Sequence, residues 1–141
     1  MAANDQSKPM TQRQYRAMAD FRYELRRFLR YSEELTRRHG ITPLQYQLLL
    51  QIKGFPGRES ATIGELAERM QAKHHGIVAL VTRCADAGLV TRRIDEQDRR
   101  NVFVELTPKG EKLLEPLARL HRNELLAIRG RISFPNLTLP E

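Results

Sequence analysis

The chain has 141 residues, of which 40% are apolar and 29% charged, and its formal net charge is +7. This length suits one domain with a modest core, and no apolar run approaches the roughly 20 residues that span a bilayer. The N-terminus lacks the apolar stretch of a secretory signal and a lone cysteine excludes an intrachain disulfide, so we expect a cytoplasmic protein without membrane partners.

The N-terminal third predicts a tail followed by a long helix. Residues 1–9 are polar, and we expect them to be disordered. Between residues 10 and 38, apolar residues recur at helical spacing while arginines dominate the other face, which predicts an amphipathic helix ended by Gly40. The apolar side consists of Phe21, Leu25, Phe28, Leu29, Ser32 and Leu35.

A second helix is marked by its capping residues. Thr42 supplies an N-cap, Pro43 a first helical residue, and Gln45 stands at the capping-box position. This helix is predicted to end near Lys53, and residues 55–60 follow as a loop rich in Pro and Gly.

Two short helices and a hairpin come next. Thr62 and Glu65 form another capping box at the start of one helix, and residues 73–87 predict the other, ended by Gly88. Alternating residues at 89–94 and 102–106 predict two strands around a charged loop. The inward stripe of the second short helix is predicted to be Ile77, Leu80, Val81 and Cys84.

These elements predict a mainly α fold with a small β-hairpin, a winged helix-turn-helix. A last helix is predicted from Thr107 to about Arg129, and its leucine stripe is broader than one neighbour needs. Apolar helices at both ends of a small domain favour burial against a second copy. We therefore expect residues 10–141 to form one domain, in which 42–110 is the DNA-binding lobe and 10–38 and 111–141 are dimerisation helices.

The basic charge is unevenly spread. Residues 59–109 hold eight basic and eight acidic side chains, so the winged region is neutral in sum. The local placement of charge is more informative, because residues 71–83 carry basic groups and no acid.

The segments GLVTRR, DRR and LTPKG, in this order and spacing, resemble the MarR family of bacterial regulators. The similarity runs from about Phe21 to Leu126. It implies a homodimer whose end helices intertwine and whose two winged lobes read adjacent half-sites of an operator in double-stranded DNA. It also implies repression relieved by a small ligand, often an aromatic anion, in a bacterial cytoplasm at the nucleoid.

The second helix of a helix-turn-helix lies in the major groove, with its N-terminal residues at base edges. Here those residues are Lys73, His74, His75 and Gly76. The predicted inward stripe leaves Val78, Ala79, Thr82 and Arg83 exposed, of which Val78 suits a thymine methyl and Arg83 a phosphate, as the matching arginine does in the family.

In the wing, Arg100 is the leading candidate for minor-groove insertion, because a narrow groove favours arginine. Asp98 is expected to orient that guanidinium, and Arg99 to contact phosphates. Arg92 and Arg93 are further phosphate candidates, although strand alternation places them on opposite faces, so only one needs to face DNA.

The family more often carries small hydroxyl residues where His74, His75 and Gly76 stand. Histidine has a reference pKa of about 6.5, so the pair suggests the hypothesis of tighter DNA binding in mild acid. The alternative is two exposed histidines without a special role.

The resemblance places an effector cavity where the first, second and fifth helices meet, with Tyr31, His39 and Tyr46 as candidate lining residues. We expect no cofactor and no metal, since the histidines lack ligand spacing, and no redox role for the inward-facing Cys84. The sequence carries no enzyme motif. The alternative function is a winged-helix dimer that binds proteins or ligands without specific DNA binding.

Overall fold

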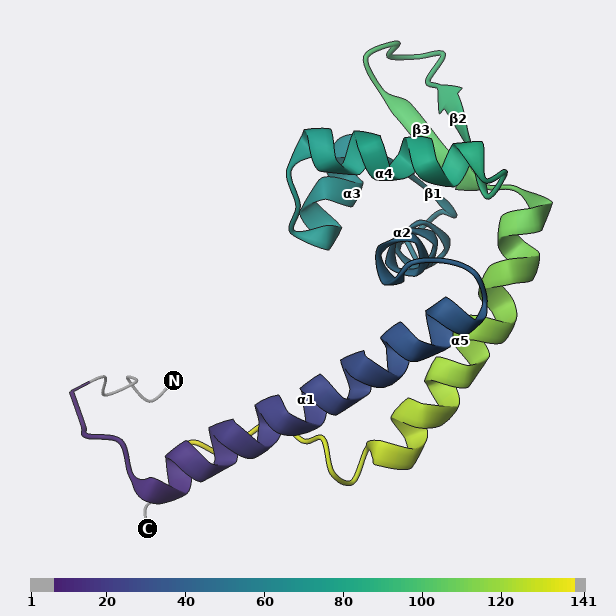
Figure 1. Ribbon diagram of the computed structural model, residues 1–141. Helices are drawn as coiled ribbons and strands as arrows, with labels where there is room; N and C mark the ends of the chain where they lie inside the picture. Colours follow the sequence, from purple (N-terminus) through teal and green to yellow (C-terminus); the bar gives the residue numbers. More distant parts are fainter. Residues whose placement is uncertain (1–6, 139–141) are drawn as a thin grey trace.

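The winged lobe sits above two diverging helices in the computed structural model of the chain, which describes residues 7–138 (Figure 1). The lobe contains three helices and a small sheet, and the long helices α1 and α5 extend away from it. The elements in order are α1 (Gln12–Arg38), α2 (Pro43–Lys53), β1 (Ser60–Thr62), α3 (Ile63–Met70), α4 (His74–Asp86), β2 (Val90–Ile94), β3 (Val102–Leu106) and α5 (Pro108–Ile128).

The capping boxes start three of these helices. At α2, Gln45 N donates to Thr42 Oγ1 (3.1 Å), and Thr42 N donates to Gln45 Oε1 (2.9 Å). The predicted Thr62–Glu65 box is likewise present at α3. A third box, Thr11 with Gln14, opens α1 and was not predicted. Each box pairs backbone N–H groups that the first turn of a helix leaves unsatisfied.

The sheet has three strands, so the prediction of a simple hairpin was incomplete. All pairs are antiparallel in the order β1-β3-β2, and Ala61 of β1 pairs with Val104 of β3. Ala61 is fully buried. A strand of three residues is too short to show an alternating pattern, and this one adjoins the Pro/Gly loop. The added strand β1 pairs with β3 and directly precedes α3, so it attaches the wing to the helices of the lobe.

Helix α2 lies at the centre of the core and contacts every other helix. Leu48, Leu49 and Ile52 are fully buried, as their apolar run predicted. The same core takes in α3 through Leu66, and it takes in α4 through the predicted stripe Ile77, Leu80, Val81 and Cys84, all of which are buried. Packing on α2 therefore fixes how α4 is presented.

The motif LTPKG forms a joint between β3, the end of α4 and α5. Thr107 N donates to Leu89 O (3.0 Å), and the Thr107 hydroxyl donates to Gly88 O. Lys109 Nζ donates to Ala87 O (2.8 Å) just beyond α4. Gly110 is buried so closely against the Leu89 carbonyl that a Cβ atom would collide with it. Three residues of the motif thus hold one junction together.

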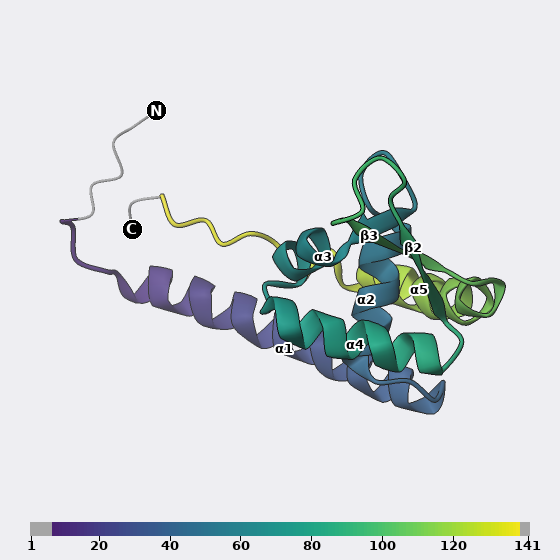
Figure 2. The ribbon, with the colours of Figure 1, turned by 90° about the horizontal axis from the view of Figure 1, so that it is seen from above.

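Helix α1 has one packed side and one open side. Phe28 and Tyr31 lie against His121 of α5, with ring centroids 6.1 Å away in each case. The other side carries exposed apolar residues, and Figure 2 shows the N-terminal half of α1 projecting away from the lobe. These exposed residues are Tyr15, Met18, Leu25 and Leu29.

Helix α5 ends at Ile128, close to the predicted end near Arg129, so residues 129–138 of the segment 111–141 expected to form a dimerisation helix are not helical. Residues 132–137 form neither helix nor strand, as expected of a segment whose Pro135 cannot donate a helical hydrogen bond. The segment returns along α1, where Gln14 Nε2 donates to Leu137 O (2.8 Å) and the rings of Phe21 and Phe134 lie 6.4 Å apart. Residues 139–141 lie outside the described part of the chain, as do residues 1–6 of the expected tail.

Candidate nucleic-acid interface

The exposed face of α4 collects the side chains that the sequence assigned to it. Its N-cap, Lys73, makes no side-chain capping hydrogen bond, so the first backbone N–H groups of the helix keep no side-chain partner there. The eight candidate residues are all exposed: Lys73, His74, His75, Gly76, Val78, Ala79, Thr82 and Arg83. A helix with one face in the core and the opposite face open suits entry into a groove.

A tight turn sets the angle between α3 and α4. Gln71 adopts a left-handed conformation (φ 50°), and Ala72 N donates to Ala67 O (3.0 Å). Three residues, 71–73, separate the two helices. This is the compact connection of a helix-turn-helix, and the predicted motif is therefore confirmed as a fold.

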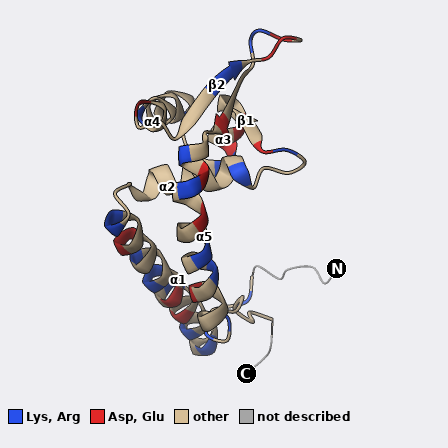
Figure 3. Ribbon diagram, turned by 90° about the vertical axis from the view of Figure 1, so that its right-hand side faces the viewer, with Lys and Arg blue, Asp and Glu red and all other residues tan. Residues whose placement is uncertain are grey.

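The wing tip is an ordered loop. Asp95 N donates to Asn101 O (3.0 Å) and Asn101 N donates to Asp98 O (2.9 Å), which close the loop between β2 and β3. Figure 3 shows basic and acidic residues side by side at this tip. The loop therefore presents its charges from a fixed backbone.

Asp98 holds Arg100 in a fork. Arg100 Nε donates to Asp98 Oδ1 and Arg100 Nη2 donates to Asp98 Oδ2, both at 3.0 Å, and the Arg100 backbone N also donates to Oδ1 (3.1 Å). The Arg100 side chain is 89% exposed, against 36% for Asp98. The guanidinium is thus held in one orientation with its remaining N–H groups turned outward.

The same contacts lower the pKa of the Asp98 carboxyl, chiefly through the hydrogen bonds from the Arg100 side chain and then from the Arg100 backbone. A depressed carboxyl pKa means that the pair persists at neutral pH and is lost only as pH falls through that lowered value. The wing fork is therefore constant between pH 6 and pH 8.

The two strand arginines face opposite ways, as alternation predicted. Arg92 reaches α4, where its Nη2 donates to Thr82 Oγ1 (2.7 Å). Arg93 lies over the Phe103 ring (5.0 Å to the centroid) and 3.5 Å from Glu105. Arg92 is the member of the pair beside the exposed face of α4.

Sequence reasoning missed Arg58, which supports the outer face of the sheet. Its guanidinium lies over the rings of Phe55 (4.6 Å) and Phe103 (5.1 Å) and pairs with Glu65. A lone arginine in a Pro/Gly loop gives no signal of this role, because its partners come from three separate elements.

The three candidate effector residues do not share one cavity. Tyr46 is buried and stacks on His121 at 4.3 Å, and burial raises the pKa of its hydroxyl. His39 Nδ1 lies 2.9 Å from Leu35 O, at the end of α1. Tyr31 lines a cavity of about 200 Å³ between α1 and α5, with Glu24, Arg27, Phe28, Glu124, Ile128 and Arg131.

His121 is a second residue that sequence reasoning left out of the site. Its Nδ1 lies 2.7 Å from Leu117 O and its Nε2 lies 2.7 Å from Ser32 Oγ. A carbonyl only accepts, so Nδ1 donates to it, and the imidazole joins α5 to α1. Its place four residues after Leu117, on the same helix face, is the signal that could have identified it as buried.

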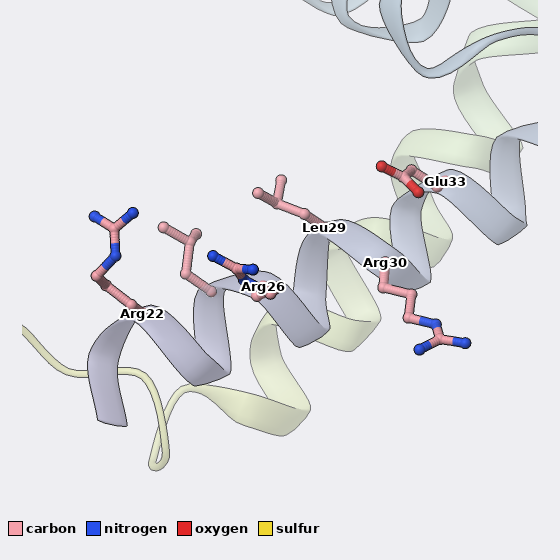
Figure 4. Close-up of a pocket in the computed structure, with 6 residues that line it drawn as sticks. Arg22, Arg26, Leu29, Arg30 and Glu33 are labelled. Atoms are coloured by element: carbon pink, nitrogen blue, oxygen red, sulfur yellow. The ribbon is translucent and has the colours of Figure 1, made fainter. Parts of the chain in front are cut away.

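A second hollow lies on the open side of α1. It has a volume of about 490 Å³ and is lined by Arg22, Leu25, Arg26, Leu29, Arg30 and Glu33. Figure 4 shows Arg22 and Leu29 rising on one side of the helix, while Arg30 turns the other way. All six residues come from α1, so this hollow is an open groove along one helix.

Cys84 is fully buried in the core, and this burial raises the pKa of its thiol to about 11. A thiol that stays protonated at neutral pH is a poor nucleophile. Among residues 7–138, no three His, Cys, Asp or Glu side chains gather as a metal site would require. None of the helices in that range has the length and apolarity needed to cross a membrane.

Comparisons with known proteins agree with this geometry. A sequence model of the MarR family matches residues 39–101, from the end of α1 through the wing loop. The HTH-type transcriptional repressor MdtR of Bacillus subtilis is 31% identical over 86 residues, which make up 60% of this chain and 54% of MdtR. The chain spans about half the length of the curated relatives it matches.

Solved structures extend the likeness to the helices outside that region. A MarR family protein from Bacillus stearothermophilus has a TM-score of 0.73 at 25% identity, covering 89% of this chain and 86% of that one. A variant of MepR from Staphylococcus aureus bound to an oligodeoxyribonucleotide has a TM-score of 0.64 at 20% identity, over 80% of this chain and 81% of that one. The fold of this chain is thus the one that these winged-helix proteins share.

Proposed function

We propose that this member of the MarR family is a dimeric transcriptional regulator that binds specific sites in double-stranded DNA. Its mode of action is repression, relieved by a small aromatic or anionic ligand, and it acts at the nucleoid in a bacterial cytoplasm. The relative MdtR is named as a repressor, which supports that direction of control.

The observation that carries this proposal is the common side of α4 and the wing. The exposed face of α4 offers donors and small apolar groups for base edges, and the forked Arg100 stands at the tip of the adjoining hairpin. A helix suits the major groove and an exposed arginine suits the narrow minor groove beside it. Helix α4 and the wing belong to the same lobe, so a single half-site would contact both.

Selection of bound fragments from random duplex DNA tests the function directly. We expect a two-fold symmetric sequence whose half-site centres lie about one helical turn apart, bound with a steep dependence on salt. Weak binding to all fragments alike would instead support the alternative, a winged-helix dimer that acts on proteins or ligands.

The open side of α1 supports a second copy as its partner. Its residues follow one another at alternating intervals of three and four, the spacing of a helix that packs along another helix. They are Tyr15, Met18, Arg22, Leu25 and Leu29. The exposed leucines Leu120, Leu125 and Leu126 of α5 add apolar surface.

We expect Leu25→Glu combined with Leu29→Glu to convert the protein from dimer to monomer, because two carboxylates would be buried without partners in the interface. Sedimentation velocity at micromolar concentration measures the change. The control is Leu44→Glu, an exposed leucine in the first turn of α2, which should leave the dimer intact. A dimer that survives the double substitution would exclude this face of α1 as the interface.

We expect DNA binding to strengthen from pH 8 to pH 6 through His74 and His75, which are exposed in the first turn of α4. Protonated imidazoles add positive charge where phosphates and guanine acceptors would lie. The measurement is a binding titration at both pH values with wild type and with the His74→Gln/His75→Gln variant. Because the wing fork is constant over this range, equal pH dependence in both proteins would contradict the hypothesis.

The cavity beside Tyr31 is the proposed effector site. The Phe28 and Tyr31 rings supply faces for an aromatic ligand, and Arg27 and Arg131 supply positive charge. Glu24 lies 3.8 Å from each of these arginines, so an anionic ligand would have to displace it from them. Aromatic carboxylates should raise the melting temperature of the wild type, and a Tyr31→Ala variant should lose that response.

A further inference from the structure

A side-chain hydrogen bond from Arg92 joins the wing to the recognition helix. In β2, Arg92 pairs with Val104 of β3, which is fully buried, so Arg92 stands on the face of the sheet that is turned toward α4. Within residues 7–138, its bond to Thr82 is the side-chain hydrogen bond that links α4 to the two wing strands.

The bond belongs to a short relay that ends on the recognition helix itself. Arg92 Nη2 donates to Thr82 Oγ1 (2.7 Å), and Thr82 Oγ1 donates its own hydrogen to Val78 O (2.9 Å). Because that hydrogen is committed, the hydroxyl is left as an acceptor for the guanidinium. Val78 and Thr82 both lie on the exposed face of α4, so the relay runs along the surface proposed to meet DNA.

The guanidinium keeps donors for another partner. A guanidinium has five N–H donors in a planar arrangement, and the hydrogen bond to Thr82 uses one of them. The Arg92 side chain is exposed at the border between α4 and the wing. The DNA backbone that separates the groove under α4 from the groove under the wing would place a phosphate at this border.

We propose that Arg92 is the positioning residue that sets the wing against the recognition helix through Thr82, and that its free N–H groups bind the DNA phosphate between the two. This inference rests on the proposed function. It assigns separate roles to two adjacent arginines of equal charge, since Arg93 is held on the opposite face by Phe103 and Glu105.

The consequence for recognition is geometric. Helix and wing must reach two grooves whose separation the duplex fixes, so a wing that drifts relative to α4 weakens specific sites more than random DNA. Thr82→Val removes the acceptor while it keeps the shape of the side chain and the charge of Arg92. Arg92→Gln removes both the relay and the phosphate ligand.

The test measures affinity by fluorescence anisotropy over a range of salt, with the selected operator and with a shuffled duplex. Thr82→Val should weaken operator binding roughly tenfold, the scale of one charge-assisted hydrogen bond, and leave the salt slope and the shuffled duplex unchanged. Arg92→Gln should add a loss of about 1 in the salt slope per half-site, or about 2 for the dimer. Arg92→Lys should keep the slope and still lose operator preference, and the Thr82→Val/Arg92→Gln double variant should match Arg92→Gln.

The matched control is Arg93→Gln, which removes the same charge one residue away and should keep operator preference. Operator binding by Thr82→Val equal to wild type, or an equal loss of preference in Arg93→Gln and Arg92→Gln, would overturn the proposal. Hydrogen exchange of the free protein gives an arm without DNA, in which the β2–β3 amides should exchange faster in Thr82→Val and Arg92→Gln only. If the wild type lacks specific sites, the proposed function fails while this arm still decides the relay.

Discussion

Replacing Arg100 by alanine is expected to weaken binding to the selected operator by roughly 5- to 150-fold per half-site. The guanidinium lies exposed in an ordered loop, and its fork with Asp98 fixes its orientation before DNA arrives. A group that is already oriented loses little rotamer freedom on binding, so its full electrostatic attraction to a narrow groove is retained. Anisotropy titrations against the operator and a shuffled duplex measure the effect.

Fold stability should be unaffected by this change, because Arg100 is exposed and contacts a neighbour within its own loop. An unchanged melting temperature is therefore the control, and Arg99→Ala is the matched variant that removes an equal charge from the adjacent position. Asp98→Asn should give an intermediate loss, since the arginine stays while its orientation is relaxed. Wild-type affinity in Arg100→Ala would remove the wing tip from the interface.

Gly110→Ala is expected to destabilise the fold. The new Cβ would collide with the Leu89 carbonyl, which belongs to backbone and cannot move aside as a flexible side chain would. Overpacking of this kind costs about 1–3 kcal/mol, and the better helix propensity of alanine recovers only about 1 kcal/mol. We expect a net loss of up to about 2 kcal/mol in the free energy of unfolding, measured in urea.

Gly64→Ala provides the comparison at a glycine with open space. Gly64 lies in the first turn of α3, and no atom stands within 4 Å of the position a Cβ would take. That substitution should be neutral or stabilising by up to about 1 kcal/mol. Equal stability of the two variants would contradict the close approach at Gly110.

The fold was predictable wherever a local signal marked it. The capping boxes Thr42–Gln45 and Thr62–Glu65 predicted the starts of two helices. The apolar stripe from Ile77 to Cys84 predicted which face of α4 is buried. Strand β1 escaped because three residues give no period, and its partner β3 lies some forty positions further along the chain. The end of α5 was predicted to within one residue, near Arg129 against Ile128, because its leucine stripe stops there.

The site divides in the same way. Pairing of Asp98 with Arg100 was predictable because the two are neighbours in one loop and opposite in charge. Alternation separated Arg92 from Arg93, but only the fold tells which of them meets α4. Tyr46, a candidate lining residue, packs on His121, a contact between residues 75 positions apart that no sequence spacing reveals.

The hydrogen bonds around Thr107 couple the orientation of the wing to that of helix α5. One residue separates β3 from α5, and its N–H and hydroxyl are both tied to the segment that follows α4. Helix α5 has 21 residues, about 31 Å at 1.5 Å per residue, so a tilt of about 10° displaces one end relative to the other by about 5 Å. A small change in how two such helices cross would therefore alter the span between two wings without reshaping either lobe.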